Sequence, residues 1–211
     1  MSKITMSVHR ALAELKTYED RLTKATGAVF VIANPKGNDK ISGKTIDDVS
    51  NEIKGNFASY ASLAENQRRI KAAVVKSNAV TIITIAGTEY TVAEAIERKA
   101  KIKYDERFLS ALKRQFNEAS SLVDRENAGL PDKIEKYLQN ILGAKDKRTA
   151  EEIASHTELY EKRYKWELVD PCGITKKIEE LEEKIISFKT EVDYALSESN
   201  ALTQIEVDFV D

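Results

Sequence analysis

Apolar residues that recur at steps of four and three constrain this chain more than any other feature. The clearest series lies near the carboxyl end and consists of Ile174, Ile178, Leu181, Ile185, Phe188, Val192 and Ala195. Because an α-helix has about 3.6 residues per turn, this spacing places the whole series on one side of a helix. Charges of both signs flank it, as they do at the edges of coiled coils. The pattern predicts a long helix that packs against a partner helix, from the same chain or from a second copy.

Similar series predict a mainly α fold, in which long helices form a bundle with coiled-coil-like packing. The predicted helices cover residues 4–25, 45–74, 92–126, 132–142, 150–164 and 174–195. Thr45 with Asp48 and Thr91 with Glu94 have the spacing of a capping box, which marks a helix start. Gly143 is the expected end of the fourth helix. Only 8 glycines and 3 prolines interrupt the 211 residues, and this scarcity also favours long helices.

Two polar residues, Asn56 and Gln67, stand at apolar positions of the second predicted helix. In one interpretation the helix rotates slightly and Phe57 takes the buried position. In the other, a buried amide sets the register between paired helices at some cost in stability. In both interpretations the helix packs against a partner.

The sequence Ser-Asn-Ala-x-Thr occurs twice, at residues 77–81 and 199–203. Asparagine tolerates the left-handed conformation that ends many helices, and the β-branched residues that follow favour a strand. The repeat therefore predicts two helix-to-strand units whose strands lie together in one small antiparallel sheet. A strand at the end of the chain is also an edge that can pair with another subunit, so we expect an oligomer. A further strand is predicted at 29–34, before Pro35 and Gly37.

Composition favours a soluble protein that binds neither DNA nor membranes. The 33 basic and 35 acidic residues nearly cancel, so no overall field attracts nucleic acid or an anionic bilayer. No run approaches 18 apolar residues, and the first residues contain no apolar leader segment. The single cysteine, Cys172, fits a reducing compartment. We expect one domain over residues 1–211, in the cytoplasm.

No catalytic or metal-binding pattern is present in the sequence. The stretch ISGKT at 41–45 resembles the end of a phosphate-binding loop, but Asn38 stands where that motif requires glycine. The two histidines, His9 and His156, lack the spacing of metal ligands, and Cys172 has no histidine beside it. We therefore expect a protein that is not an enzyme and needs no cofactor or metal.

Two basic or basic-aromatic stretches are candidates for binding an anionic ligand. The candidate residues are Arg68, Arg69, Lys76, Arg163, Tyr164, Lys165 and Trp166. Cations supply charge for a phosphate, and aromatic rings supply stacking surface for a base. The same residues also suit structural roles, because cations stabilise helix carboxyl ends and aromatic residues often anchor a core.

Four blocks of the sequence resemble the septicolysin-like family of small helical proteins, whose longer members occur among phage and prophage genes. These blocks are HRALAELKTYEDRL, SNAVT with TVAEAIERK, KWELVD, and EVDYALSESNALTQIEV. Residues 29–45 and 128–158 look like insertions relative to the family. The resemblance implies a helical bundle that self-associates, and it implies no enzyme activity.

Three functions are compatible with these observations. The first is a non-catalytic oligomeric binding protein, encoded by a phage, that sequesters a cyclic or ADP-ribose-type nucleotide in the host cytoplasm and so blocks defence. The second is a phage structural or assembly protein acting through helix-helix and edge-strand contacts. The third, a membrane-active toxin, is suggested by the family name alone.

Overall fold

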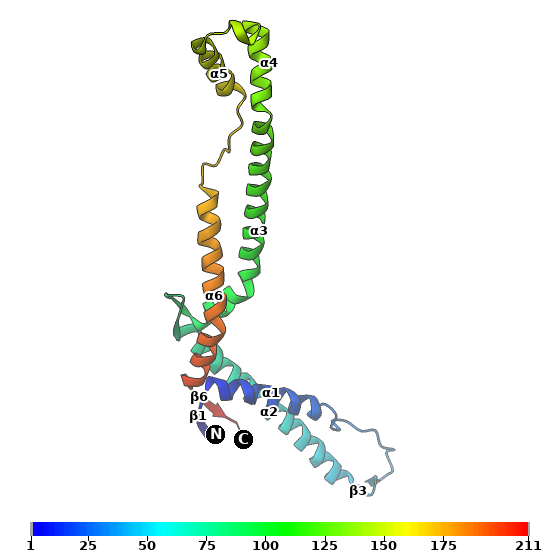
Figure 1. Ribbon diagram of the computed structural model, residues 1–211. Coiled ribbons are helices and arrows are strands. Elements are labelled where there is room, and N and C mark those ends of the chain that lie inside the picture. Colours follow the sequence, from blue (N-terminus) through cyan, green and yellow to red (C-terminus); the bar gives the residue numbers. More distant parts are fainter. Residues whose placement is uncertain (1, 211) are drawn as a thin grey trace. The chain divides into compact units, whose positions relative to one another are not determined.

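The computed structural model describes residues 2–210 and confirms a mainly α fold with small antiparallel strand pairs (Figure 1). Its α-helices are α1 (Val8–Ala25), α2 (Ile46–Val80), α3 (Val92–Ala128), α4 (Leu130–Leu142), α5 (Ala150–Tyr164) and α6 (Ile174–Leu202). Its strands are β1 (Ser2–Ser7), β2 (Lys40–Ile41), β3 (Lys44–Thr45), β4 (Ile82–Ile85), β5 (Thr88–Thr91) and β6 (Gln204–Phe209). The strands pair antiparallel as β1 with β6, β2 with β3, and β4 with β5.

The chain divides into two compact units. The first unit contains the residues up to Ala100 together with those from Ser187 onward, and the second contains Lys101–Ile186. Helices α3 and α6 each contribute residues to both units. A single domain with insertions at 29–45 and 128–158 stays a prediction.

The partner helix of α6 comes from the same chain. In the first unit, Lys99 of α3 forms an ion pair with Asp193 of α6, and the Arg98 guanidinium lies 4.8 Å from the ring centre of Phe188. In the second unit, Nζ of Lys113 lies 2.6 Å from Oε1 of Glu182. Ion pairs in both units and a cation–ring contact in the first unit therefore join α3 to α6, as the mixed charges beside the apolar series predict.

The first helix begins at Val8, so the prediction of a helix from Ile4 is wrong. Residues 2–7 instead form β1, whose Ile4 and Met6 stand opposite Val207 and Ile205 of β6. The hydroxyl of Ser7 then accepts a hydrogen bond from the N–H of Arg10 at 3.2 Å and starts α1. Residues four apart lie on the same side of an α-helix and also on the same face of a β-strand, so the spacing of Ile4 and Val8 fits both structures. The strand formed because β6, at the other end of the chain, pairs with it.

The predicted strand at 29–34 is also absent. This segment has no regular secondary structure and no β partner within residues 2–210, and Val31 is 86% exposed. It lies along α2, where the Val29 carbonyl accepts a hydrogen bond from the Asn56 amide at 3.0 Å and the Phe30 ring meets Tyr60 edge to face. β-branched and aromatic residues favour extended backbone, but a strand forms only where a second strand can pair with it.

Two helix starts follow their sequence signals closely, and each comes directly after a β-hairpin. Thr45 with Asp48 and Thr91 with Glu94 form capping boxes, in which the threonine hydroxyl and backbone N–H both donate to the acidic side chain. Those hydrogen bonds lower the pKa of Asp48 and of Glu94. Before these helices, β2–β3 and β4–β5 are hairpins whose turns contain Gly43 (φ 84°) and Gly87 (φ 74°). Tight hairpin turns require such positive φ values.

A hydrophobic core in the first unit joins α1, α2 and the β1–β6 pair (Figure 1). The buried members of this core are Met6, Val8, Ala11, Tyr18, Ile70, Val74, Ile205 and Val207. The prediction that the two strands following the Ser-Asn-Ala-x-Thr motifs share a sheet is wrong, because β4 pairs with β5 and β6 pairs with β1. The strand after the first motif, β4, therefore pairs with the next strand along the chain, and the strand after the second motif, β6, pairs with the first strand of the chain.

Neither interpretation of the polar positions on α2 describes the structure. Phe57 is 66% exposed, so it does not replace Asn56 in a buried position. The buried amide of this helix is Asn66, which is 7% exposed and lies next to the predicted Gln67. The Asn66 side chain donates to the Val210 carbonyl at 2.9 Å and accepts from the Val210 N–H at 2.8 Å. A buried amide does set register here, between α2 and the chain end rather than between two helices.

In the second unit, α4 and α5 pack through aromatic rings and one buried cation. Ring centres of Tyr137 and Tyr160 lie 4.8 Å apart, and those of Tyr160 and Tyr164 lie 4.5 Å apart. The Arg148 side chain is 2% exposed. It donates to the Gly143 carbonyl at 2.7 and 2.9 Å and to Glu135 at 3.1 Å. Arg148 thus satisfies the carboxyl end of α4, which the sequence predicts at Gly143.

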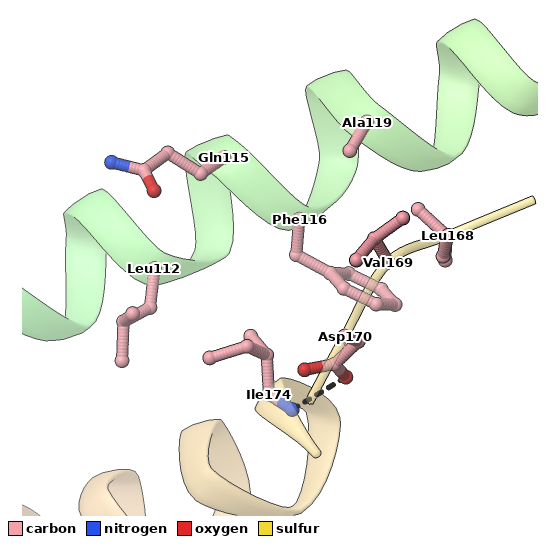
Figure 2. A pocket seen from close by; sticks show the side chains of 8 residues that line it. All are labelled: Leu112, Gln115, Phe116, Ala119, Leu168, Val169, Asp170 and Ile174. Atoms are coloured by element: carbon pink, nitrogen blue, oxygen red, sulfur yellow. Dashed lines mark hydrogen bonds between the residues drawn. The ribbon is translucent and has the colours of Figure 1, made fainter. Parts of the chain in front are cut away.

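The segment between α5 and α6 covers an apolar pocket of about 190 Å³ on α3 (Figure 2). Leu112 and Phe116 line it from α3, and Leu168 and Val169 line it from the segment. The carboxylate of Asp170 accepts a hydrogen bond of 2.7 Å from the N–H of Ile174, drawn as a dashed line in Figure 2. This bond caps the first turn of α6.

Candidate binding surface

The two Ser-Asn-Ala-x-Thr motifs have the same structure. The first motif (Ser77–Thr81) ends α2 before β4, and the second motif (Ser199–Thr203) ends α6 before β6. In each, the threonine N–H donates to the serine carbonyl at 2.9 Å, which closes the last helical turn. The prediction that each motif turns a helix into a strand is confirmed.

Each motif is also tied to the start of another helix. The Thr81 carbonyl accepts a hydrogen bond of 2.9 Å from the N–H of Val92, the first residue of α3. The Thr203 carbonyl accepts an equal bond of 2.9 Å from the N–H of Val8, the first residue of α1. Val8 and Val92 are both 2% exposed. The same backbone junction is therefore built twice within the first unit.

Contacts between the two junctions are reciprocal. Arg69 of α2 donates to the carbonyl of Asp208, after the second motif, at 2.9 Å. Glu191 of α6 accepts from the N–H of Ala86, after the first motif, at 2.6 Å. Arg69 and Glu191 precede their motifs by the same number of residues, and Asp208 and Ala86 follow theirs by the same number. Reciprocal contacts of this kind define a local twofold relation.

This relation produces two grooves of nearly equal volume. The β4 groove, of about 410 Å³, is lined by Thr81, Ile82, Ile83, Thr84, Ala195, Glu198, Ser199, Leu202 and Thr203. The β6 groove, of about 420 Å³, is lined by Thr203, Gln204, Ile205, Glu206, Ala73, Lys76, Ser77, Val80 and Thr81. Every lining residue of one groove has its counterpart in the other. The grooves adjoin, because Thr81 and Thr203 line both.

The two grooves differ in charge. Lys76 stands immediately before the serine of the first motif, and Glu198 stands immediately before that of the second. Both side chains are exposed, and within residues 2–210 neither forms an ion pair. The unpaired charge in the β6 groove is therefore a cation, because its other charged residue, Glu206, pairs with Lys3, and the unpaired charge at the equivalent place in the β4 groove is an anion.

Arg68 and Arg69, predicted as ligand-binding residues, share one carboxylate. Arg68 contacts Glu65 through two hydrogen bonds of 2.7 and 2.8 Å, and Arg69 contacts it at 2.7 Å. Hydrogen bonds from Arg68 and then Arg69 lower the pKa of Glu65 to about 2. Glu206 and Asp208 line the same surface hollow. Glu65 therefore offsets part of the charge of this pair, and Arg69 also binds the β6 backbone.

The other predicted ligand residues, apart from Lys76, belong to the second unit. Arg163 lies with its guanidinium carbon 5.6 Å from the ring centre of Tyr164, which is part of the tyrosine stack. The Trp166 backbone is held by the Asn127 side chain through bonds of 2.8 and 2.9 Å, and its indole is partly exposed. Lys165 ends α5. The predicted residues thus fall into a first-unit set and a second-unit set.

Sequence reasoning identified Lys76 but missed Glu198, its counterpart across the grooves. The signal that could have found Glu198 was available, since aligning the two motifs places Lys76 and Glu198 at the same position. Asn66 carried no comparable signal, because its partner Val210 is remote in sequence and the apolar series points to Gln67 instead.

Over residues 2–210, no helix has both the length and the apolar character needed to cross a bilayer. In the same stretch, the His, Cys, Asp and Glu side chains form no group of three that could hold a metal ion.

Compared with known proteins, the chain matches no family model, no curated protein and no solved structure. The resemblance to the septicolysin-like family therefore stays a prediction, as do the nucleotide ligand and the phage origin.

Proposed function

We propose that this protein is a non-catalytic assembly protein that associates with further copies of itself through helix and strand-edge contacts. Exposed large hydrophobic side chains outnumber the buried hydrophobic residues in the described part of the chain, which supports this proposal. Exposed apolar side chains that lie together often mark a contact surface for a partner, whereas single ones are ordinary.

The observation that carries the proposal is the apolar rim of the paired grooves. Val80 is 70% exposed, Ile82 is 56% exposed and Leu202 is 73% exposed, and all three line a groove. The strands beside them belong to two-stranded sheets, so each strand has one unpaired edge. Apolar side chains next to a strand edge that no second strand covers form a surface to which a protein partner can bind.

Sedimentation velocity over a range of micromolar concentrations tests this function. We expect the weight-average sedimentation coefficient to rise with concentration toward that of a dimer or larger oligomer, because association covers the apolar rim. A coefficient that stays at the value of one chain across the whole range would contradict self-association.

A second candidate function is capture of a small anionic ligand, such as a cyclic or ADP-ribose-type nucleotide, as a phage-encoded sponge would do in the host cytoplasm. The specific observation in its favour is Arg163. Within residues 2–210 this guanidinium has no carboxylate partner, and it lies beside the Tyr164 ring. The exposed Trp166 follows two residues later in the chain. A free cation beside aromatic rings suits a phosphate with an attached base.

Calorimetric titration with cyclic dinucleotides and ADP-ribose tests this candidate. For a ligand that binds, Arg163→Glu should weaken the affinity at least about tenfold, because it replaces an attractive charge by a repulsive one. Lys184→Glu is the matched control, since Lys184 is exposed on α6 of the same unit and makes none of the ring contacts of Tyr137, Tyr160 and Tyr164. Absence of binding to the unmodified protein, or equal loss in both variants, would reject the candidate.

A further inference from the structure

The paired grooves place one positive and one negative side chain on either side of the local twofold relation. Lys76 and Glu198 occupy equivalent positions in the two motifs, so the relation that superimposes the junctions exchanges them. Points exchanged by a twofold rotation lie at the same height along its axis and on opposite sides of it. Lys76 and Glu198 therefore stand at the same level, separated by the adjoining grooves.

A second copy can complement this arrangement by symmetry alone. If a copy faces the first along the local axis and is related to it by a twofold axis perpendicular both to that axis and to the line that joins Lys76 and Glu198, its Glu198 lies over the first copy's Lys76. Its own Lys76 then lies over the first copy's Glu198. An interface of this isologous kind uses the same surface on both copies. The exposed side chains of Val80, Ile82 and Leu202 would lie between the two ion pairs.

We propose that the paired β4 and β6 grooves are the dimer interface of this protein, and that reciprocal Lys76–Glu198 ion pairs between two copies set its orientation. This inference rests on the proposed self-association and names the surface responsible. The partner that binds these grooves is a second copy, because the surface is complementary in charge to itself. It presents both Lys76 and Glu198, and neither side chain has an ion-pair partner within the described residues. Charge of this kind contributes to orientation and specificity, while the apolar rim contributes contact area.

Single charge reversals test the two ion pairs. Lys76→Glu makes both inter-copy pairs Glu–Glu, and Glu198→Lys makes both Lys–Lys. Each variant should therefore raise the dimer dissociation constant, measured by sedimentation velocity, at least about tenfold. Lys71→Glu is the matched control, because Lys71 is exposed on the same helix and lines neither groove. It should change the constant less than about twofold.

Mixing the two variants gives the sharper test. A mixed dimer contains one Lys76→Glu chain, with two acidic groups at the interface, and one Glu198→Lys chain, with two basic groups there. Each acidic group of the first chain then faces a basic group of the second. Both pairs are again of opposite sign. Native mass spectrometry of an equimolar mixture, with one chain isotopically labelled, should show predominantly mixed dimers. A pair within one chain could not be rescued by mixing.

Circular dichroism and thermal melting show whether each variant is folded. Should a reversal impair folding, Lys76→Gln and Glu198→Gln replace it, since they remove the attraction without adding repulsion. The neutral variants should also weaken the dimer, by a smaller factor. High salt should reduce the difference between each variant and the unmodified protein, because exposed charges are screened.

The contrary outcomes separate this inference from the proposed function. If the protein dimerises but folded reversals leave its dissociation constant unchanged, the interface lies elsewhere and self-association stands. The same holds if reversals weaken the dimer but mixing does not favour mixed dimers, because the pairing is then not reciprocal. If the unmodified protein is a monomer throughout, both the interface and the proposed function are rejected.

Discussion

Replacing Asn66 by leucine is expected to lower the free energy of unfolding of the first unit by about 2–4 kcal/mol. The Asn66 side chain forms hydrogen bonds of 2.9 and 2.8 Å with the backbone of Val210, on the part-buried side of α2. Leucine fills a similar volume but neither donates nor accepts. The Val210 N–H and carbonyl would then lose their partners in a part-buried place, and the loss of a partner there costs more than the bonds themselves contribute. Urea unfolding followed by circular dichroism measures the change.

Gln67→Leu is the control for this prediction. Gln67 is the neighbouring amide and is only partly buried, and within residues 2–210 no hydrogen bond holds its side chain to the chain end. Its replacement should change the free energy of unfolding by no more than about 0.5 kcal/mol. Equal effects of the two substitutions would show that the Asn66–Val210 bonds contribute little to stability.

The substitution Ile70→Ala should have an effect at least as large, with a loss of about 2–5 kcal/mol. Ile70 is 0% exposed and belongs to the core formed by α1, α2 and the β1–β6 pair. Truncation removes buried methyl and methylene groups and leaves a cavity, because elements from three parts of the chain cannot all move to fill it. The measurement is the midpoint and slope of the same urea transition.

Val75→Ala provides the comparison, since Val75 is on the same helix and 59% exposed. Its effect should be small in the monomer. If Ile70→Ala lowers the free energy of unfolding no more than Val75→Ala does, this core does not limit the stability of the first unit.

The helices were largely predictable because their signals are local. The apolar series of the last helix, the capping box at Thr45 and the glycine end at Gly143 each involve residues within a few turns of one another. The interactions that start and end a helix involve residues that are close in sequence, so one sequence is enough to identify these helices.

Strand pairing was not predictable to the same degree. β1 and β6 lie at opposite ends of the chain, and the residues of β1 fit a helical series as well as a strand. Segment 29–34 has stronger strand propensity but forms no strand, since no partner from residues 2–210 pairs with it. Propensity describes how well a residue suits extended backbone, whereas the ladder of hydrogen bonds depends on a second segment.

The candidate site shows the same division. The repeat at 77–81 and 199–203 predicted two helix-to-strand junctions, and the structure contains both. That the junctions contact each other reciprocally, and so form adjoining grooves with Lys76 in one and Glu198 in the other, was not visible in the sequence. The pairing of Arg68 and Arg69 with Glu65 was within reach of sequence reasoning, because residues three and four apart face each other on a helix.

The sequence by itself determined where this protein forms helices, how most of them start and end, and that two of them turn into strands through the same motif. Those outcomes depend on residues that are close in sequence, because a short segment has its own free-energy preference for helix, turn or strand. Only the tertiary structure decided which strands pair, which amide of α2 is buried, and that the two motifs meet. Those outcomes depend on contacts between segments that are far apart in sequence. Such a contact stabilises the protein only once the fold has brought the two segments together.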